Sequence, residues 1–226
     1  MLVALISDIH ANLDALKAVM DAIPDVDRIL CCGDIVGYYD KPNEVCALLR
    51  NRDVHCIRGN HDAYVLGALV PDATRRQAYR TDWTREVLEK DHLDWLRGLP
   101  VELSFAESGT TLRMRHASPW DEETYLYRDA TAALARLNLE PGEILAVGHT
   151  HYPLHIPAGD GWLLNPGSVG QPRDRDPRSC YALLDLETNS VEHHRVSYDV
   201  SAMQQRLAEQ DWDPKMIAIL SRTATQ

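Results

Sequence analysis

Apolar residues form short, uninterrupted runs in the first quarter of the chain, and helical spacing follows most of them. Residues 2–6, 28–32 and 54–57 are predicted to be buried strands. Residues 13–22 and 43–50 place apolar side chains three and four positions apart, as amphipathic helices do. This alternation of strand, loop and helix predicts an α/β region in which some of the strands pair in parallel.

The strand signal disappears between residues 63 and 98, where the sequence favours helices. We expect one helix over "ATRRQAYRTDWTREVLEK" and a second over "DHLDWLRGLP", ended by Gly98 and Pro100. We interpret residues 63–98 as a small helical insert, or cap, over the α/β core. The alternative is a packed helical layer with an arginine-rich face toward solvent.

Strands dominate again beyond residue 100. The sequence predicts a hairpin that turns at Ser108-Gly109, then a helix near residues 129–138. Further strands are expected over "ILAV", "GWLL", "CYALLDLE" and "SVEHHRVSY", with a helical tail from Ser201. Because strands occur in both halves, we predict an α/β fold in which two mixed β-sheets pack face to face and are flanked by helices. This four-layer αββα sandwich would form a single domain over residues 1–226.

Composition and charge narrow the classes of function. The 226 residues are 45% hydrophobic and 25% charged, which suits one sizeable domain with a full core. The net charge of −11 argues against binding long nucleic acid, because neutralising phosphates requires clustered Lys and Arg. Bound metal cations could offset part of this negative charge.

The sequence shows neither a targeting segment nor a disulfide framework. The apolar run at the amino terminus has no preceding basic region and is interrupted by Ser7-Asp8, and no stretch is long enough to cross a bilayer. The five cysteines form neither a CxxC pattern nor an even-numbered scaffold. We therefore expect reduced thiols in the core of a cytoplasmic protein.

Five short polar motifs follow the carboxyl ends of predicted strands, the edge at which open α/β sheets bind ligands. They are "SDIH" with Asp8 and His10, "CGDIVG" with Asp34, "RGNHD" with Asn60 and His61, "RHASP" with His116, and "VGHTH" with His149 and His151. Half of the ten histidines lie in these motifs. Their recurrence at one structural position predicts a shared site.

The spacing within the motifs supports that prediction. Asp-x-His and His-x-His place two side chains two residues apart, so in extended backbone each pair would project to one side. Gly33, Gly59 and Gly148 precede the polar residues and would permit sharp turns and close approach of the backbone.

Each motif also has a plainer explanation when it is taken alone. An Asp such as Asp8 most often caps the following helix, and a single His after a strand is more often structural than a ligand. We expect Asp62 to be such a cap and assign it no chemistry. All of these explanations would have to hold together at five separate strand ends, so a functional site is the better interpretation.

The combined side chains offer imidazole nitrogens, two carboxylates and one amide oxygen. These are too many ligands for one tetrahedral zinc, and no cysteine is among them. Mixed oxygen and nitrogen ligands suit a pair of divalent metal ions such as Mn, Fe, Ni, Zn or Mg. A two-metal site with ions about 3.5–4 Å apart clamps a transferring phosphoryl group, and a bridging water becomes the attacking hydroxide.

The five motifs, taken in order, resemble those of the calcineurin-like metallophosphoesterase superfamily. They read D-x-H, G-D, G-N-H-D, H and G-H-x-H, and the resemblance runs from Asp8 to about Ser168. The resemblance implies one metal bound by Asp8, His10 and His151. It implies a second metal bound by Asn60, His116 and His149, with Asp34 bridging the two. His61 would bind no metal and would instead stabilise the phosphate or protonate the leaving oxygen.

Departures from the family pattern indicate a subgroup. Protein Ser/Thr phosphatases continue the second motif as GDxxDRG, whereas Gly37 and Tyr38 occupy those Asp and Arg positions here. The segments "GDIVGYYDKPNEVC", "DHLDWLRGLP" and "NPGSVGQPRD" resemble the small prokaryotic phosphodiesterase group. The expected activity is therefore hydrolysis of a small or nucleotide-like phosphate ester. The alternatives are a catalytically weak metal-binding scaffold of the same fold, and a nuclease.

The loop "NPGSVGQPRDRDPR", residues 165–178, allows two interpretations. Its residues 165–170 could present backbone N–H groups to a phosphate, with Arg173 and Arg175 contacting an anionic substrate. It could equally be a solvated loop whose arginines pair with Asp174 and Asp176. The sequence does not decide between them.

Overall fold

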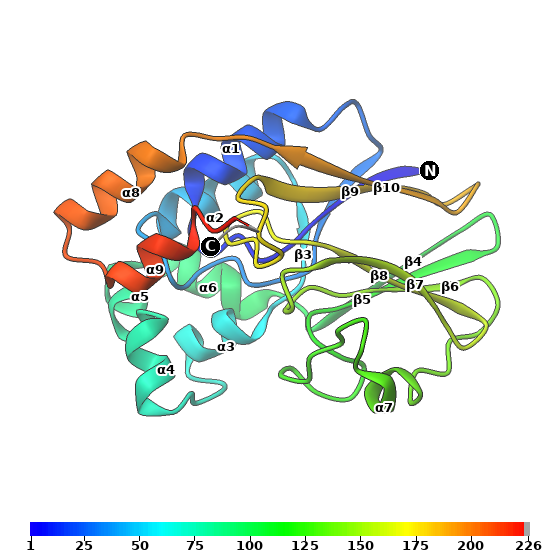
Figure 1. The fold of residues 1–226 in the computed structure, drawn as a ribbon. Coiled ribbons are helices and arrows are strands. Elements are labelled where there is room, and N and C mark those ends of the chain that lie inside the picture. Colours follow the sequence, from blue (N-terminus) through cyan, green and yellow to red (C-terminus); the bar gives the residue numbers. More distant parts are fainter. Residues whose placement is uncertain (224–226) are drawn as a thin grey trace.

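A computed structural model of the chain describes residues 1–223, in which ten strands form two five-stranded sheets (Figure 1). The first sheet has the order β10-β9-β1-β2-β3: β10 (Ser190–Val196), β9 (Ser179–Asp185), β1 (Leu2–Ile6), β2 (Arg28–Cys31) and β3 (His55–Cys56). The second has the order β4-β5-β6-β8-β7: β4 (Glu102–Glu107), β5 (Thr110–Arg115), β6 (Glu143–Ala146), β8 (Gly161–Pro166) and β7 (Pro153–Ala158).

Both sheets are mixed, and their inner faces form one core between them. β1, β2 and β3 run in parallel, as do β5, β6 and β8, while β9, β10, β4 and β7 pair in antiparallel fashion. Leu5 lies in register with Leu30 on one side and Ala182 on the other, and all three are fully buried. Met114 and Leu164 reach the same core from the second sheet. The predicted fold class, two packed mixed sheets with helices, is confirmed.

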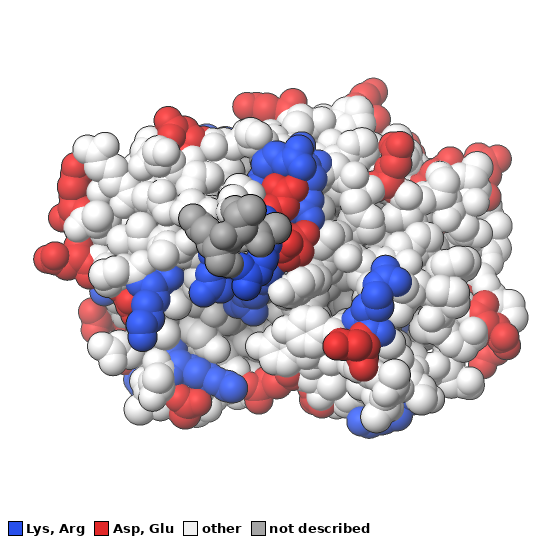
Figure 2. Space-filling model, in the orientation of Figure 1, with Lys and Arg blue, Asp and Glu red and all other residues white. Residues whose placement is uncertain are grey.

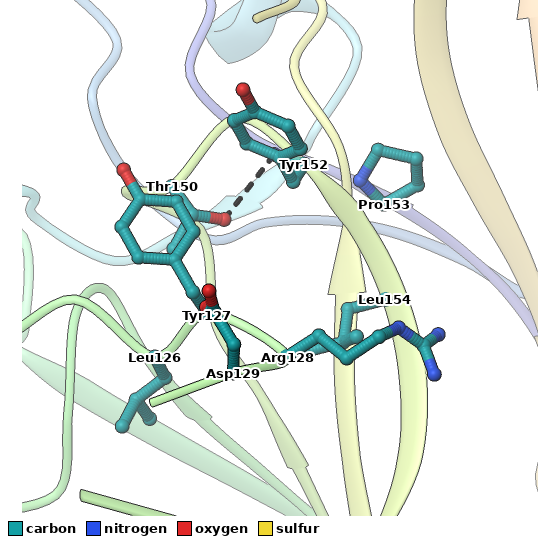
Figure 3. A pocket seen from close by; sticks show the side chains of 8 residues that line it. All are labelled: Leu126, Tyr127, Arg128, Asp129, Thr150, Tyr152, Pro153 and Leu154. Atoms are coloured by element: carbon teal, nitrogen blue, oxygen red, sulfur yellow. Dashed lines mark hydrogen bonds between the residues drawn. The ribbon is translucent and has the colours of Figure 1, made fainter. Parts of the chain in front are cut away.

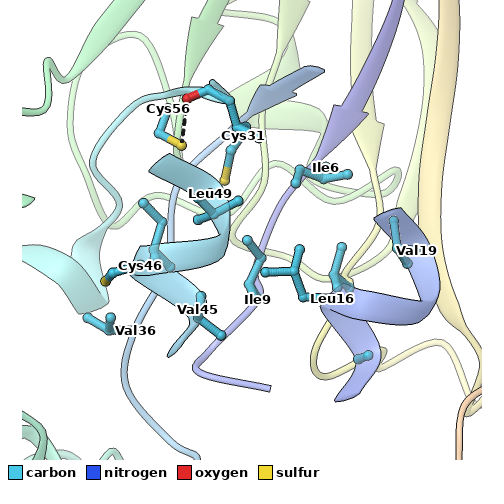
Figure 4. Close-up of a cluster of buried hydrophobic side chains, with 14 of the residues drawn as sticks. Ile6, Ile9, Leu16, Val19, Cys31, Val36, Val45, Cys46, Leu49 and Cys56 are labelled. Carbon is cyan, nitrogen blue, oxygen red and sulfur yellow. Dashed lines mark hydrogen bonds between the residues drawn. The ribbon is translucent and has the colours of Figure 1, made fainter. Parts of the chain in front are cut away.

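Two amphipathic helices cover the outer face of the first sheet. These are α1 (Leu13–Ala22) and α2 (Pro42–Asn51). Leu16 and Leu49 pack with Ile6 in a fully buried apolar cluster (Figure 4). The Asn12 side chain accepts a hydrogen bond from the Ala15 N–H and so caps α1. Burial of this face holds the loops after β1 and β2 in place.

The outer face of the second sheet has a thinner cover. The helix expected near residues 129–138 is only α7 (Thr131–Leu134), and loop residues such as Leu126 and Leu137 complete the cluster. β7 was not expected from the sequence, because Pro153 and Pro157 discourage a strand. It is an edge strand that pairs with β8 alone, where prolines are tolerated.

Short helices fill the segment in which no strand was expected. They are α3 (Asn60–Leu66), α4 (Ala73–Ala78), α5 (Thr81–Val87) and α6 (Lys90–Gly98). The prediction of one continuous helix over residues 73–90 is wrong. Arg80 adopts a left-handed backbone conformation with φ 55° and separates α4 from α5. Its guanidinium lies 4.0 Å from the centroid of the Trp212 ring, an attraction that local sequence does not reveal.

The helical tail consists of α8 (Val200–Glu209) and α9 (Pro214–Ile219), as expected. Arg206 on α8 forms ion pairs with Asp40 and Asp14, each at 2.7 Å, and the Asp40 side chain is almost fully buried. The Trp212 indole N–H donates to the Tyr38 carbonyl at 2.6 Å. The tail therefore anchors the loop that follows β2.

The cysteines and the lengths of the helices can be compared with the expectations from the sequence. All five cysteines lie within the described residues, are buried and carry free thiols, as predicted for core thiols. No helix in residues 1–223 is long and apolar enough to cross a membrane.

Candidate metal centre

The five polar motifs meet at one edge of the molecule. Asp8 follows β1, Asp34 follows β2 and Asn60 follows β3, while His116 and His149 follow β5 and β6 of the other sheet. The seven predicted ligands, Asp8, His10, Asp34, Asn60, His116, His149 and His151, are all at least 96% buried. Parallel pairing brings these strand ends together, as expected from the sequence.

The first group of ligands contains Asp8, His10 and His151. The Nε2 atoms of His10 and His151 are 3.1 Å apart, and Nε2 of His151 lies 3.3 Å from Oδ1 of Asp8. Oδ2 of Asp34 is 3.7 Å from Nε2 of His10. These four side chains therefore converge on a single point.

The second group contains Asp34, His116 and His149, with Asn60 beside it. Nε2 of His116 lies 2.9 Å from Oδ1 of Asn60 and 3.3 Å from Oδ2 of Asp34. Asp34 thus belongs to the second group and also lies beside His10 of the first, as a bridging carboxylate would.

Backbone carbonyls determine how the imidazoles are oriented. Nδ1 of His116 donates to the Cys32 carbonyl at 2.7 Å, and Nδ1 of His151 donates to the Gln171 carbonyl at 2.5 Å. Because a carbonyl only accepts, the Nε2 atom of each ring faces the site, and in the neutral ring, the form that binds metals, it carries the lone pair. His149 is oriented the other way: its Nε2 donates to the Glu123 carbonyl at 3.0 Å, so Nδ1 is the atom that it could offer to a metal.

Burial and the pairing of His116 with Asp34 together determine the pKa values in the site. Burial lowers the pKa of His10 to about 4 and that of His149 to about 3. Both rings are therefore neutral at pH 7, and each can offer a nitrogen lone pair to a metal. Burial also disfavours charge on His116, but the Asp34 carboxylate, together with Asp8 and the Cys32 carbonyl, outweighs this effect and raises the pKa of His116 to about 10. For Asp34 the burial effect is likewise overcome, mainly by His116, and its pKa lies well below the usual range.

These donors fit divalent cations. Two neutral imidazoles presenting lone pairs 3.1 Å apart repel each other unless a proton or a cation lies between them. Oxygen and nitrogen ligands without thiolate suit the ions expected from the sequence, which are Mn, Fe, Ni, Zn or Mg.

The ligands occupy an unusual backbone conformation. Five of the seven have positive φ: Asp8 (53°), His10 (52°), Asp34 (55°), His149 (64°) and His151 (62°). The expectation that each i, i+2 pair projects from extended backbone is therefore wrong, although the side chains still converge. Left-handed conformations at non-glycine residues cost free energy and concentrate at functional sites, where the surrounding structure imposes them.

Two glycines allow the ligand loops to touch. A Cβ atom added to Gly59 would lie 2.2 Å from Oδ1 of Asp34, and one on Gly148 would lie 2.0 Å from the Ser7 hydroxyl oxygen. The predicted need for close backbone approach is confirmed at both positions.

Asp62 has a larger structural role than the expected helix cap. Its carboxylate accepts the Gly59 N–H at 2.9 Å, as a residue in the first turn of α3 can. It also accepts the N–H groups of Ile35 and Val36, both at 3.0 Å. The carboxylate thus ties the Asn60 loop to the Asp34 loop, a contact that sequence reasoning did not find.

His61 lies beside the ligands in an aromatic environment. Its ring centroid is 4.2 Å from that of Tyr79, 4.7 Å from that of Tyr38 and 4.8 Å from that of His10. Its backbone N–H donates to Oδ1 of Asp34 at 2.8 Å. Nδ1 of this buried ring has no hydrogen-bond partner among the residues that the structure describes. On distance alone, His61 could join His10 and Asp34 around a metal.

Comparisons with known proteins identify the family. The sequence matches the calcineurin-like phosphoesterase superfamily domain over residues 1–189. The chain belongs to the calcineurin-like phosphoesterase superfamily. It is 32% identical to an uncharacterized protein of Methanocaldococcus jannaschii, covering 92% of each chain. It is 29% identical to a probable metallophosphoesterase of Methanothermobacter thermautotrophicus, covering 88% of this chain and 95% of that one.

Solved structures extend the similarity to the whole fold. A metallophosphoesterase from Sphaerobacter thermophilus is 32% identical with a TM-score of 0.83, and 98% of each chain is covered. A hypothetical protein from Pyrococcus horikoshii has a TM-score of 0.85 at 24% identity, with 99% of each chain covered. The tail lies beyond the matched family domain, yet Arg206 on α8 and Trp212, which follows α8, contact the loop after the Asp34 motif.

The loop at residues 165–178 does not offer the predicted row of free amides. The N–H groups of Val169 and Gly170 donate to the carbonyls of Ser7 and Asp8, and the Gly167 N–H donates to Oδ1 of Asn165. That part of the phosphate-binding hypothesis is wrong at these positions. The amides instead fasten the loop to the one that carries Asp8.

The arginines of this loop have different surroundings. Arg178 pairs with Asp176 at 2.7 Å, as the solvated-loop alternative predicted, and Asp174 pairs with Arg195. Arg175 is exposed and donates to the Thr223 carbonyl at 3.5 Å.

Arg173 instead turns toward the metal centre. It donates to the Tyr38 hydroxyl at 3.3 Å and to the Gln171 side chain at 3.1 Å. Within residues 1–223, no carboxylate lies within ion-pair distance of its guanidinium.

Tyrosines around the metal centre were missed by sequence reasoning. The Tyr125 ring stacks on His149 with centroids 3.9 Å apart, and Tyr38 and Tyr79 flank His61. Tyr38 directly follows the Asp34 motif, which is a local signal. Tyr79 and Tyr125 carry no such signal, because they reach the site only through the tertiary fold.

Proposed function

We propose that the protein is a phosphodiesterase that hydrolyses a small or nucleotide-like phosphate ester with a pair of divalent metal ions. Family membership supports metal-dependent phosphoester hydrolysis. The observation that carries the two-metal proposal is the position of Asp34, whose Oδ2 lies 3.7 Å from Nε2 of His10 in the first group and 3.3 Å from Nε2 of His116 in the second. When bound, such a metal pair supplies an activated water and neutralises charge on the reacting phosphate.

We assign His61 to the phosphate and not to a metal. Nδ1 of this buried ring has no hydrogen-bond partner among the described residues, and rings on both sides keep the imidazole in place. From this position it would stabilise the phosphate or deliver a proton to the leaving alcohol oxygen. Its backbone N–H supports Asp34 independently of the side chain. Truncation of the ring should therefore spare metal binding.

We assign Arg173 to substrate binding. An arginine without a carboxylate partner beside a phosphate site is suited to pair with an anionic oxygen. Its contacts with Tyr38 and Gln171 restrict the guanidinium to the side of the site near Asp8. Arg175, the second arginine expected to contact an anionic substrate, lies at the surface of the same loop.

We also propose that residues 1–226 act as one catalytic domain in which the helices of residues 63–98 form a cap. Two contacts support this role. The Tyr79 carbonyl, between α4 and α5, accepts the Tyr38 N–H at 2.9 Å, and the Tyr79 ring covers His61. A cap positioned in this way would limit access of water and of bulky substrates to the site.

Metal add-back tests the proposal. Protein stripped with a chelator should hydrolyse p-nitrophenyl phosphate or bis(p-nitrophenyl) phosphate only after Mn, Fe, Ni, Zn or Mg is restored, with the diester preferred. Metal analysis should find two ions per chain. Fewer than one ion per chain would favour the scaffold alternative, and strongly salt-dependent binding of duplex DNA would favour a nuclease.

The His61→Ala variant separates binding from catalysis. We expect unchanged metal content and a loss of turnover of about 10²–10⁴-fold, the usual contribution of a general acid. His155→Ala is a suitable control, because His155 is a half-buried histidine on β7 outside the five motifs. Equal turnover of His61→Ala and wild type would remove His61 from the mechanism.

A further inference from the structure

A cavity of about 610 Å³ adjoins the metal centre on the side of the His149-x-His151 motif (Figure 3). Its lining residues are Leu126, Tyr127, Arg128, Asp129, Thr150, Tyr152, Pro153 and Leu154. Thr150 stands between the two ligands His149 and His151 in the chain, so the cavity and the metal centre share one loop. No part of the proposed chemistry uses this space.

The cavity walls are aromatic and apolar. The rings of Tyr127 and Tyr152 meet edge to face with centroids 5.7 Å apart, and Figure 3 shows them on neighbouring sides of the cavity. Tyr152 is 39% exposed, so part of its surface is open to a ligand. Arg128 and Asp129 are exposed at the rim and offer both hydrogen-bond donors and acceptors. The volume of the cavity lies in the range of small-molecule sites, about 300–1,000 Å³.

A column of aromatic rings connects the cavity to the metal ligands. Tyr125 stacks on His149 at 3.9 Å, and Tyr127 lies parallel to Tyr125 with centroids 5.5 Å apart. Tyr127 itself lines the cavity, so the stacked rings run from the cavity wall to the ligand His149. A phosphate at the metal centre and a ring in the cavity would therefore lie at the two ends of this aromatic column.

We propose that this tyrosine cavity binds the nucleobase of a nucleoside phosphodiester whose phosphate occupies the metal centre. The inference rests on the proposed phosphodiesterase function and specifies its substrate class. A planar base would stack against the open tyrosine surface, and its polar edge would meet Arg128 or Asp129. A substrate with a purely aliphatic group at this position would leave the cavity to water.

Two esters with the same leaving group test the inference. Thymidine 5′-(p-nitrophenyl phosphate) and ethyl p-nitrophenyl phosphate both release p-nitrophenol, so only the retained group differs. We expect kcat/KM of the metal-loaded wild type to be at least about tenfold higher for the thymidine ester, the lower part of the range for base–aromatic stacking. Tyr152→Leu and Tyr127→Leu should each move this ratio toward one.

Trp162→Leu is the matched control. Trp162 lies on the adjacent strand β8, is 40% exposed like Tyr152, and does not line the cavity. Its loss should leave the ratio unchanged. A wild-type ratio near one, or a ratio that neither tyrosine substitution changes, would overturn the inference while leaving the phosphodiesterase proposal intact.

Binding to metal-free protein separates the two proposals. If no ester is hydrolysed with any metal, the proposed function fails, and the cavity is tested by calorimetry with adenosine 5′-monophosphate. A base site is supported if Tyr152→Leu lowers the affinity for adenosine 5′-monophosphate at least about fivefold and Trp162→Leu leaves that affinity unchanged. Absent binding, or equal binding by wild type and Tyr152→Leu, would refute it.

Discussion

Asp62 offers a direct test of how the catalytic loops are held together. Its carboxylate accepts three buried backbone N–H groups, from Gly59, Ile35 and Val36, at 2.9–3.0 Å. Asp62→Ala removes every one of these acceptors and leaves the donors inside the protein. The side chain makes no contact that the proposed chemistry requires, so the perturbation acts on the scaffold of the site.

The geometry gives the expected cost. Each buried donor left unsatisfied costs about 1–3 kcal/mol, and removal of a buried carboxylate recovers part of its desolvation penalty. We therefore expect Asp62→Ala to lower the free energy of unfolding by about 3 kcal/mol. Asp62→Asn can keep the bonds to Ile35 and Val36 through its oxygen but turns its NH₂ group toward the Gly59 N–H, so about 2 kcal/mol is expected.

Urea unfolding followed by circular dichroism measures this difference. The protein should be metal-free, because a ligand that binds only the folded state would add its own stabilisation. Asp199→Ala is the control: this exposed cap of α8 accepts one bond, from Ala202 at 2.9 Å, and should cost about 1 kcal/mol. The reasoning is refuted if Asp62→Ala is no more destabilising than Asp199→Ala.

Three further predictions concern the metal site, the thiols and the tail. Gly59→Ala should lower the number of metal ions bound per chain, because its Cβ would lie 2.2 Å from Oδ1 of Asp34. Gly98→Ala, where the added Cβ meets nothing within 4 Å, should bind as many metal ions as wild type. Equal metal content in the two variants would contradict the steric argument. The five buried cysteines should not react with Ellman's reagent within minutes in native protein, and all five should react in denaturant. The reason is that burial blocks access of the reagent and raises the pKa of four of the thiols. Rapid labelling of the native protein would show that the core opens. Arg206→Ala should reduce the free energy of unfolding by about 2 kcal/mol, since it leaves the Asp40 carboxylate buried and unpaired, and an unfolding curve matching wild type would refute this.

Much of the site could be predicted from the sequence because its chemistry is local. Asp8, Asp34 and Asn60 each follow an apolar run, and the end of such a run is visible without knowledge of the fold. Parallel pairing then brings the ends of those runs to one edge. The same logic identified His116 and His149 on the second sheet.

The errors arose where a local rule met a tertiary contact. A helix was expected to continue through Arg80, but stacking on Trp212 accompanies a left-handed break there. The amides of Val169 and Gly170 looked free for a phosphate, but they bond to the Asp8 loop. Helical propensity and loop composition do not encode such partners, which lie far away in the chain.

The sequence by itself determined which residues could bind metal, because ligand identity and position after a strand are properties of single short segments. Only the tertiary structure decided the left-handed backbone at Asp8 and Asp34, since packing of one loop against another imposes it. It also decided the aromatic surroundings of the site. Tyr79 and Tyr125 come from segments distant in the chain, and only the packing of two sheets brings them to the metal centre.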